Sequence, residues 1–229
     1  MASKTRNKAA AQGAKGKGGR RPPVRAKSGP DLMLLPIAVG AILLLLAGGL
    51  VVYYLANNHS TPAPPGPAKA AGIPCDHLEH TQVHYHAAIQ IVYQGVVHPI
   101  PSNIGIQGNP ASPTCYYWLH VHSAYADTIH IESPANRTFT LGDFFIVWTT
   151  WNRSQGLPAE PLDSTHVSTL TLTPDQTLVV YVDLSDGKGP HVYSGDPKTI
   201  VLKPHEIITL EITPPKVTPP PPFTFASSL

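Results

Sequence analysis

The chain has 229 residues and carries 16 Lys and Arg against 14 Asp and Glu, a formal net charge of +2. Nine of the basic residues precede Asp31, the first acidic residue, so the chain from Leu32 onward holds 7 basic and 13 acidic residues. The positive charge therefore belongs to a short N-terminal tail, and the composition argues against a nucleic-acid-binding domain and against nucleic acid as a partner.

Residues 32–55 contain no charged side chain and end in a pair of tyrosines. About 20 apolar residues are enough to cross a bilayer as a helix, whereas the apolar part of a cleaved signal peptide is typically ~7–15 residues long. The sequence predicts one uncleaved membrane-spanning helix, with a cleaved signal as the competing interpretation. The basic residues 1–31 are then a disordered cytoplasmic tail, and the rest of the chain lies outside the membrane.

Composition divides the part after this helix into three segments. Residues 56–72 are rich in Pro and Ala and are expected to form an extended linker, and residues 214–229 form a second Pro-rich segment that ends the fold. The folded domain is expected over residues 73–213. It contains Cys75 and Cys115, which belong to no CxxC motif, and an even number of cysteines outside the cytoplasm favours a disulfide over two free thiols.

Short runs of β-branched and aromatic residues, separated by Gly, Pro, Asn and Asp, predict strands in this domain. The runs occupy residues 84–93, 116–122, 128–132, 177–184, 199–202 and 207–212. We expect a mainly β fold, an antiparallel sandwich or barrel-like domain. Thr140 and Asp143 have the spacing of a capping box that begins a short helix, but the β-branched and aromatic residues that follow are also compatible with a strand.

Histidines recur at alternate positions of three of these strands. In a strand, residues i and i+2 lie on one face, and here the intervening residues are mostly aliphatic or aromatic, as on a core face. If the three strands are neighbours, their polar faces form one patch of possible metal ligands. The predicted ligands are His84, His86, His120, His122, His130 and Glu132.

Neutral imidazole binds Zn, Cu, Fe and Ni, and Cu(II) has the highest affinity in the divalent series. We therefore expect a transition metal, copper or zinc, with copper slightly preferred. A blue-copper centre is not expected, because it needs a free Cys thiolate and usually a Met, and the two methionines are Met1 and Met33. Without metal, the same cluster would be a solvated or pH-responsive polar face. The remaining histidines are expected in turns or on the surface: His59, His77, His80, His98, His166, His191 and His205.

Residues 117–145 contain a Leu-His-x-His stretch, an Ile-His-x-Glu-Ser-Pro stretch and a Thr-Leu-Gly. In these motifs, and around residues 194–211, the chain resembles a family of membrane-anchored extracytoplasmic bacterial and archaeal proteins whose members are uncharacterised. The resemblance covers about half of the external domain and implies a shared site rather than a reaction. Ser123 departs from the family, in which an acidic residue follows the second histidine.

Together these observations predict a single-pass protein of the cell membrane whose external domain binds a transition metal. Whether the chain is an enzyme stays open, and binding is favoured because no acid, base or nucleophile is identifiable beyond the histidines. One alternative is an accessory subunit that docks on a membrane-protein partner, with the histidines as a pH-sensitive surface. Another is a cupin-like metal-dependent oxidoreductase.

Overall fold

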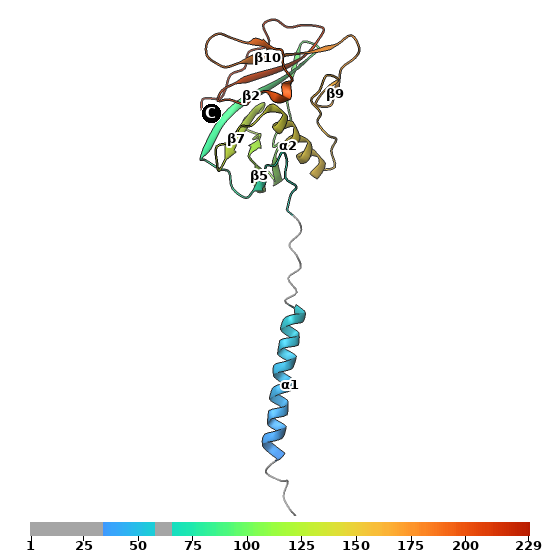
Figure 1. The fold of residues 1–229 in the computed structure, drawn as a ribbon, viewed down its shortest axis with the longest axis vertical. Coiled ribbons are helices and arrows are strands. Elements are labelled where there is room, and N and C mark those ends of the chain that lie inside the picture. Colours follow the sequence, from blue (N-terminus) through green and yellow to red (C-terminus); the bar gives the residue numbers. More distant parts are fainter. Residues whose placement is uncertain (1–33, 58–65) are drawn as a thin grey trace, which may run out of the picture. The chain divides into compact units, whose positions relative to one another are not determined.

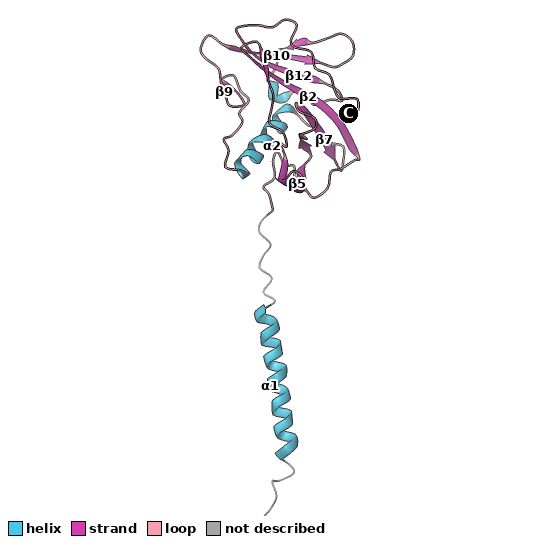
Figure 2. Cartoon of the chain, turned by 180° about the vertical axis from the view of Figure 1, so that it is seen from behind, coloured by secondary structure: helices cyan, strands magenta, loops and turns pink. Residues whose placement is uncertain are grey.

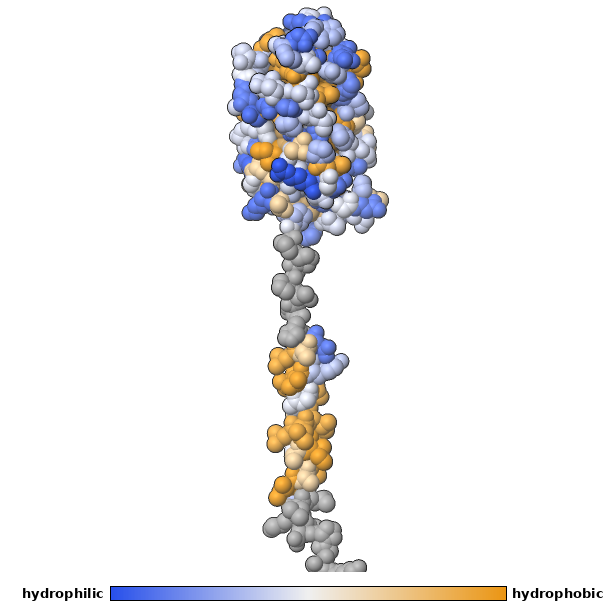
Figure 3. Space-filling model, turned by 90° about the vertical axis from the view of Figure 1, so that its right-hand side faces the viewer, coloured by the Kyte–Doolittle hydropathy of each residue, from blue (hydrophilic) through white to orange (hydrophobic). Residues whose placement is uncertain are grey.

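The computed structural model describes residues 34–57 and 66–229, which belong to two separate units. The first unit contains helix α1 (Leu34–Asn57). Its segment Pro36–Asn57 is long and apolar enough to cross a membrane, and its side chains are exposed to the surroundings (Figure 3). The predicted basic tail and residues 58–65 of the predicted linker lie outside the described residues.

The second unit is built on a seven-stranded sheet with the order β11–β10–β12–β2–β7–β6, in which β3 also pairs with β2 (Figure 1). Its strands are β2 (Val83–Tyr93), β3 (Val96–His98), β6 (Leu119–His120), β7 (Thr128–Ser133), β10 (Thr177–Asp183), β11 (His191–Tyr193) and β12 (Ile207–Thr213). The mainly β prediction is confirmed. The sheet is mixed, however, because β12 runs parallel to β2 while the other pairs are antiparallel.

A smaller antiparallel sheet has the order β1–β5–β4. It comprises β1 (Cys75–Asp76), β4 (Ile106–Asn109) and β5 (Ser112–Tyr117). Cys75 and Cys115 form a disulfide that joins two neighbouring strands, as the sequence predicts. The single strand expected over residues 116–122 is interrupted at Trp118, where the chain leaves this sheet and enters the larger one at β6. A short hairpin of β8 (His166–Val167) and β9 (Leu170–Thr171) lies apart from both sheets.

The segment after Thr140 forms a helix, α2 (Leu141–Ser154), and not the alternative strand. Thr140 accepts a hydrogen bond from the backbone N–H of Asp143, and the Asp143 carboxylate accepts one from the backbone N–H of Thr140. This reciprocal pair satisfies two amides that a helix start leaves free. Helix α2 lies alongside the strands of the large sheet (Figure 2). Its residues Phe144 and Trp148, one turn apart, are buried in the hydrophobic core.

The strand predicted over residues 199–202 does not form. A 3-10 turn, η1 (Pro197–Thr199), occupies its beginning, and only Val201 makes an isolated bridge, to Thr140. The side chain of Asp196 accepts a hydrogen bond from the backbone N–H of Lys198, and Pro197 has the backbone angle that a helical turn requires. Local capping therefore overrides the β-branched composition of this segment.

The C-terminal Pro-rich segment lies along the domain. The carboxylate of Glu211, a fully buried residue of β12, accepts a hydrogen bond from the backbone N–H of Val217. Further on, the ring of Phe225 lies against His205, with centroids 5.0 Å apart. Residues 214–229 thus cover part of the face of the large sheet that is opposite the hydrophobic core.

Candidate metal centre

The register of three adjacent strands brings the predicted ligands together. On β2, β7 and β6, His86 lies directly opposite His130, which lies directly opposite His120. In the next row, His84 is paired with Glu132. The alternating neighbours of these residues, such as Ile129 and Ile131 of β7, are fully buried in the core, so the register that buries the aliphatic face also aligns the polar one.

The cluster is deep at its centre and open at its rim. His120 and His130 are 0% and 4% exposed, and His86 and Glu132 are also buried. The side chains of His84 and His122 retain 43% and 30% of their accessible surface. Ligands at the rim can therefore be reached from solvent, while those at the centre are held rigidly by the sheet.

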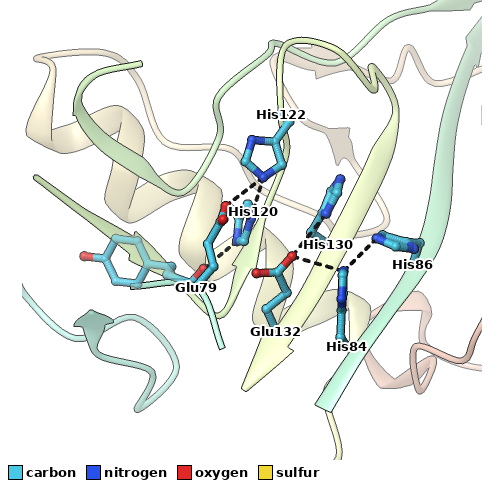
Figure 4. A network of polar contacts seen from close by, with 8 residues as sticks. Glu79, His84, His86, His120, His122, His130 and Glu132 are labelled. Carbon is cyan, nitrogen blue, oxygen red and sulfur yellow. Dashed lines mark hydrogen bonds and ion pairs between the residues drawn. The ribbon is translucent and has the colours of Figure 1, made fainter. Parts of the chain in front are cut away.

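His84 and His86, both on β2, form the first pair of imidazoles (Figure 4). Their Nε2 atoms lie 3.2 Å apart. Glu132 Oε1 lies 3.3 Å from the Nε2 of His84 and 3.3 Å from the Nδ1 of His130. One carboxylate oxygen thus joins this pair to the histidine at the centre of the cluster.

His120 and His122 form the second pair, with Nε2 atoms 3.1 Å apart. His122 lies just past the end of β6, so its place in the cluster depends on the loop that follows as well as on the strand. The Nδ1 of His120 lies 2.9 Å from the carbonyl oxygen of Tyr117. A carbonyl only accepts hydrogen bonds, so Nδ1 carries a proton and donates it to Tyr117, and Nε2 is the nitrogen that faces the cluster, as in a metal-binding histidine.

Glu79 is a member of the cluster that the sequence pattern does not identify. Its Oε1 lies 2.9 Å from the Nε2 of His122 and 3.4 Å from that of His120 (Figure 4). It belongs to the loop between β1 and β2, where no strand periodicity marks a face. The preceding Asp76 fixes this loop by accepting a hydrogen bond from the indole N–H of Trp118 at 2.7 Å.

His130 lies between the two pairs. Its ring centroid is 4.5 Å from that of His86 and 4.6 Å from that of His122, with the rings nearly perpendicular in each case. Its Nε2 is buried and has no hydrogen-bond partner among residues 34–57 and 66–229. A buried imidazole nitrogen without a partner is costly unless something binds there, and a metal ion is a natural occupant.

Burial sets the protonation state of the cluster. It lowers the pKa of His86 to about 4, with the neighbouring His130 and His84 acting in the same direction. Burial likewise lowers the pKa of His122 and of His130. Burial alone would raise the pKa of Glu132, but the hydrogen bond with His130 and the nearby imidazoles outweigh it and lower this pKa.

The pKa of Glu79 is lowered as well, chiefly by its hydrogen bond with His120. The shifted histidines are therefore neutral at pH 7 while the two carboxyl groups are ionised. These are the protonation states that a metal ion requires of its ligands.

The distances fit a metal ion. Within each of two sets of side chains, one ligand atom per residue can be chosen so that all lie within 4.8 Å of one another. One set is His84, His86 and His130, and the other is His120, His122, His130 and Glu132. The structure thus brings all six predicted ligands into one cluster and adds Glu79.

The other described histidines lie outside this cluster. His98, His166 and His191 are on β3, β8 and β11, and His205 contacts Phe225. His77 and His80 lie in the loop that carries Glu79, and His80 Nε2 is 2.7 Å from Asp76 Oδ2. His59 falls outside the described residues.

Comparison of the chain with protein-family models, with curated proteins and with solved structures finds no match.

Proposed function

We propose that this protein is a membrane-anchored, extracytoplasmic metal-binding protein that holds copper or zinc in the histidine and glutamate cluster. The observation that carries the proposal is the convergence of four imidazoles on a fifth, that of His130, whose buried Nε2 lacks a partner among the described residues. A merely solvated polar face would leave such a nitrogen in contact with water.

The ligand types support a transition metal of intermediate softness. Imidazole with carboxylate suits zinc and copper, whereas Mg²⁺ and Ca²⁺ prefer all-oxygen sites. Copper is the first choice, because Cu(II) binds imidazole more tightly than Zn(II) does.

The open rim supports binding and transfer of the metal rather than permanent burial of it. His84 and His122 are the exposed members of the two pairs, so a metal ion can be passed to or from them without unfolding the sheet. Neighbouring ligands on rigid strands then draw the ion into the buried part of the cluster.

Two features support a location outside the cytoplasm. Helix α1 is long and apolar enough to cross a membrane, and the Cys75–Cys115 disulfide is of the kind that persists in oxidising compartments. An uncleaved α1 would keep the metal-binding domain at the membrane surface.

Calorimetric titration of the full-length protein in detergent micelles at pH 7.5 tests the proposal, with Cu(II) and Zn(II) as the probes. We expect binding by the wild type and a loss of about 100-fold or more in affinity for the His120→Gln, His122→Gln double variant, since even residues that only orient ligands contribute 10–100-fold. His191→Gln, at an exposed histidine of β11, is the matched control and should bind as the wild type does.

Two results would contradict the proposal. The first is no heat of binding and no retained metal after dialysis at neutral pH. The second is equal affinity of the double variant and the wild type, which would place the metal elsewhere on the chain.

A further inference from the structure

The cluster is built from two similar halves. Each half contains a His-x-His pair whose Nε2 atoms are 3.1–3.2 Å apart. Each half also has a carboxylate oxygen within 3.4 Å of its pair: Glu132 beside His84, and Glu79 beside His120 and His122. The two halves come from different elements of the chain. The first is formed by the adjacent strands β2 and β7, and the second by the end of β6 and the loop between β1 and β2.

One metal ion cannot use all of these groups. Zn–N bonds are ~2.0–2.1 Å long, so two nitrogens on one ion are at most about 4.2 Å apart. The seven side chains also exceed the four ligands of a typical zinc site. The ligand atoms fall into two sets, and His130 is the only residue that belongs to both.

His130 is placed to serve both halves. Its Nδ1 lies 3.3 Å from Glu132 Oε1, which also contacts His84, so this nitrogen faces the first half. Its Nε2 is buried and without a partner among the described residues, and the ring lies 4.6 Å from that of His122 in the second half. An imidazole has two nitrogens on opposite sides of the ring, but the neutral ring keeps a proton on one of them, here Nδ1 beside Glu132. For each half to bind an ion through His130, the ring must release this proton to solvent, which leaves an imidazolate with one lone pair for each half.

The charges are also distributed over two positions. Two divalent ions at the surface of a sheet repel each other, and separate carboxylates reduce the charge at each. Glu132 is 6% exposed and lies between the halves, since its oxygen also falls within the second set. Glu79 supplies a further negative charge on the opposite side, next to His122.

We infer that the cluster binds two transition-metal ions, one at His84 and His86 and the other at His120 and His122, with the deprotonated imidazole of His130 shared between them and the carboxylates of Glu132 and Glu79 beside them. This inference rests on the proposed metal-binding function and specifies its stoichiometry and ligands. Each ion has an exposed histidine of its own, His84 or His122, so each is accessible from the rim.

Equilibrium dialysis of the full-length protein in detergent against Cu(II), with glycine as a competing weak chelator, measures the number of ions. The wild type should retain two equivalents. The His84→Gln, His86→Gln variant and the His120→Gln, His122→Gln variant should each retain one. His191→Gln should retain two, and tryptophan fluorescence verifies that each variant is folded.

Glu79→Gln gives a test that leaves the buried sheet untouched, because this side chain is 37% exposed and lies on a loop. This substitution should lower the affinity for one of the two Cu(II) ions about 10–100-fold and leave the affinity for the other unchanged.

Electron paramagnetic resonance tests the shared ligand. Two Cu(II) ions joined through one imidazolate couple magnetically, so the second equivalent should reduce the signal of the first. In His130→Gln, the signals of the two ions should add.

The outcomes separate this inference from the proposed function. One equivalent in the wild type, lost in both double variants, would mean a single ion and overturn the inference while the proposed function stands. Two equivalents with additive signals in the wild type would overturn the shared role of His130. No binding at all would refute both the inference and the proposed function.

Discussion

The low pKa of His86 should make the metal-free protein sensitive to mild acid. Burial holds this pKa at about 4 in the folded protein, whereas in the unfolded chain the group titrates near the ordinary value of ~6.5. As the pH falls through 6.5, the unfolded state takes up a proton that the folded state refuses. The contribution of neutral His86 to the free energy of unfolding is therefore fully present above pH 6.5 and is lost as the pH falls from 6.5 to 4.

The two pKa values set the size of the effect. Proton linkage between them gives a loss of about 2 kcal/mol in the free energy of unfolding from pH 7.5 to 5.0. For a domain of this size that corresponds to a melting temperature lower by about 4–8 °C. The lowered pKa values of His122 and His130 act in the same direction, so the wild type should lose more than this amount.

The His86→Gln variant isolates this contribution, because glutamine keeps polar groups at the position and does not titrate. Urea unfolding with a metal chelator present, at pH 7.5 and 5.0, should show a pH-dependent loss that is smaller in the variant by about 2 kcal/mol. Tryptophan fluorescence reports on the domain alone, since all three tryptophans belong to it: Trp118, Trp148 and Trp151.

His191→Gln, at an exposed position of β11, serves as the control and should follow the wild type. If His86→Gln loses as much stability as the wild type between the two pH values, His86 is protonated in the folded protein, and the argument from its burial is wrong.

Three further predictions concern the scaffold. Replacing Cys75 and Cys115 by Ala should cost about 4 kcal/mol, the chain-entropy value for a loop of 40 residues, in guanidinium unfolding; an unchanged midpoint would show that the disulfide is dispensable. Gly105→Ala should lower the free energy of unfolding by more than about 2 kcal/mol and weaken metal binding, because Gly105 has φ +77° and an added Cβ would lie 2.5 Å from a carbonyl oxygen of β6. Gly156→Ala is the control, because Gly156 has φ +72° but open space around it; it should cost only about 1 kcal/mol and leave metal binding unchanged. If the two glycine variants bound metal equally well, the role of β6 in the cluster would be contradicted. Thr140→Ala should cost about 1 kcal/mol by removing the cap of α2, measured by thermal unfolding, and a variant as stable as the wild type would mean that the capping box contributes nothing.

Local alternation was sufficient to predict β2 and β7 and the face on which their ligands lie. His84 and His86 alternate with core residues, as do His130 and Glu132, and side-chain direction in a strand follows from position alone. The capping box after Thr140 was also visible in the sequence. Deciding between helix and strand there required the core, because it is the burial of Phe144 and Trp148 on one helical face that stabilises α2.

Features that depend on distant parts of the chain could not be predicted in this way. Gln90 and Thr209 meet in the parallel pair β2–β12 although they are 119 positions apart. Glu79 reaches the cluster from a loop whose path is fixed by the hydrogen bond between Asp76 and Trp118, and no periodicity encodes such a contact. The sheet order and the seventh side chain of the cluster were both missed because they are set by long-range contacts.

The parallel pairing of β2 with β12 has a consequence for biosynthesis. The strands β2, β6 and β7, which supply the histidines, have all been synthesised by Ser133, and Cys75 and Cys115 precede that point as well. At ribosomal rates of about 5–20 residues/s, β12, the partner for the other edge of β2, is completed only roughly 4–16 s later. The half of the domain that carries the cluster is therefore already synthesised while one edge of β2 is still unpaired, because β12 has not yet been made. During this interval the nascent chain is exposed to edge-to-edge association.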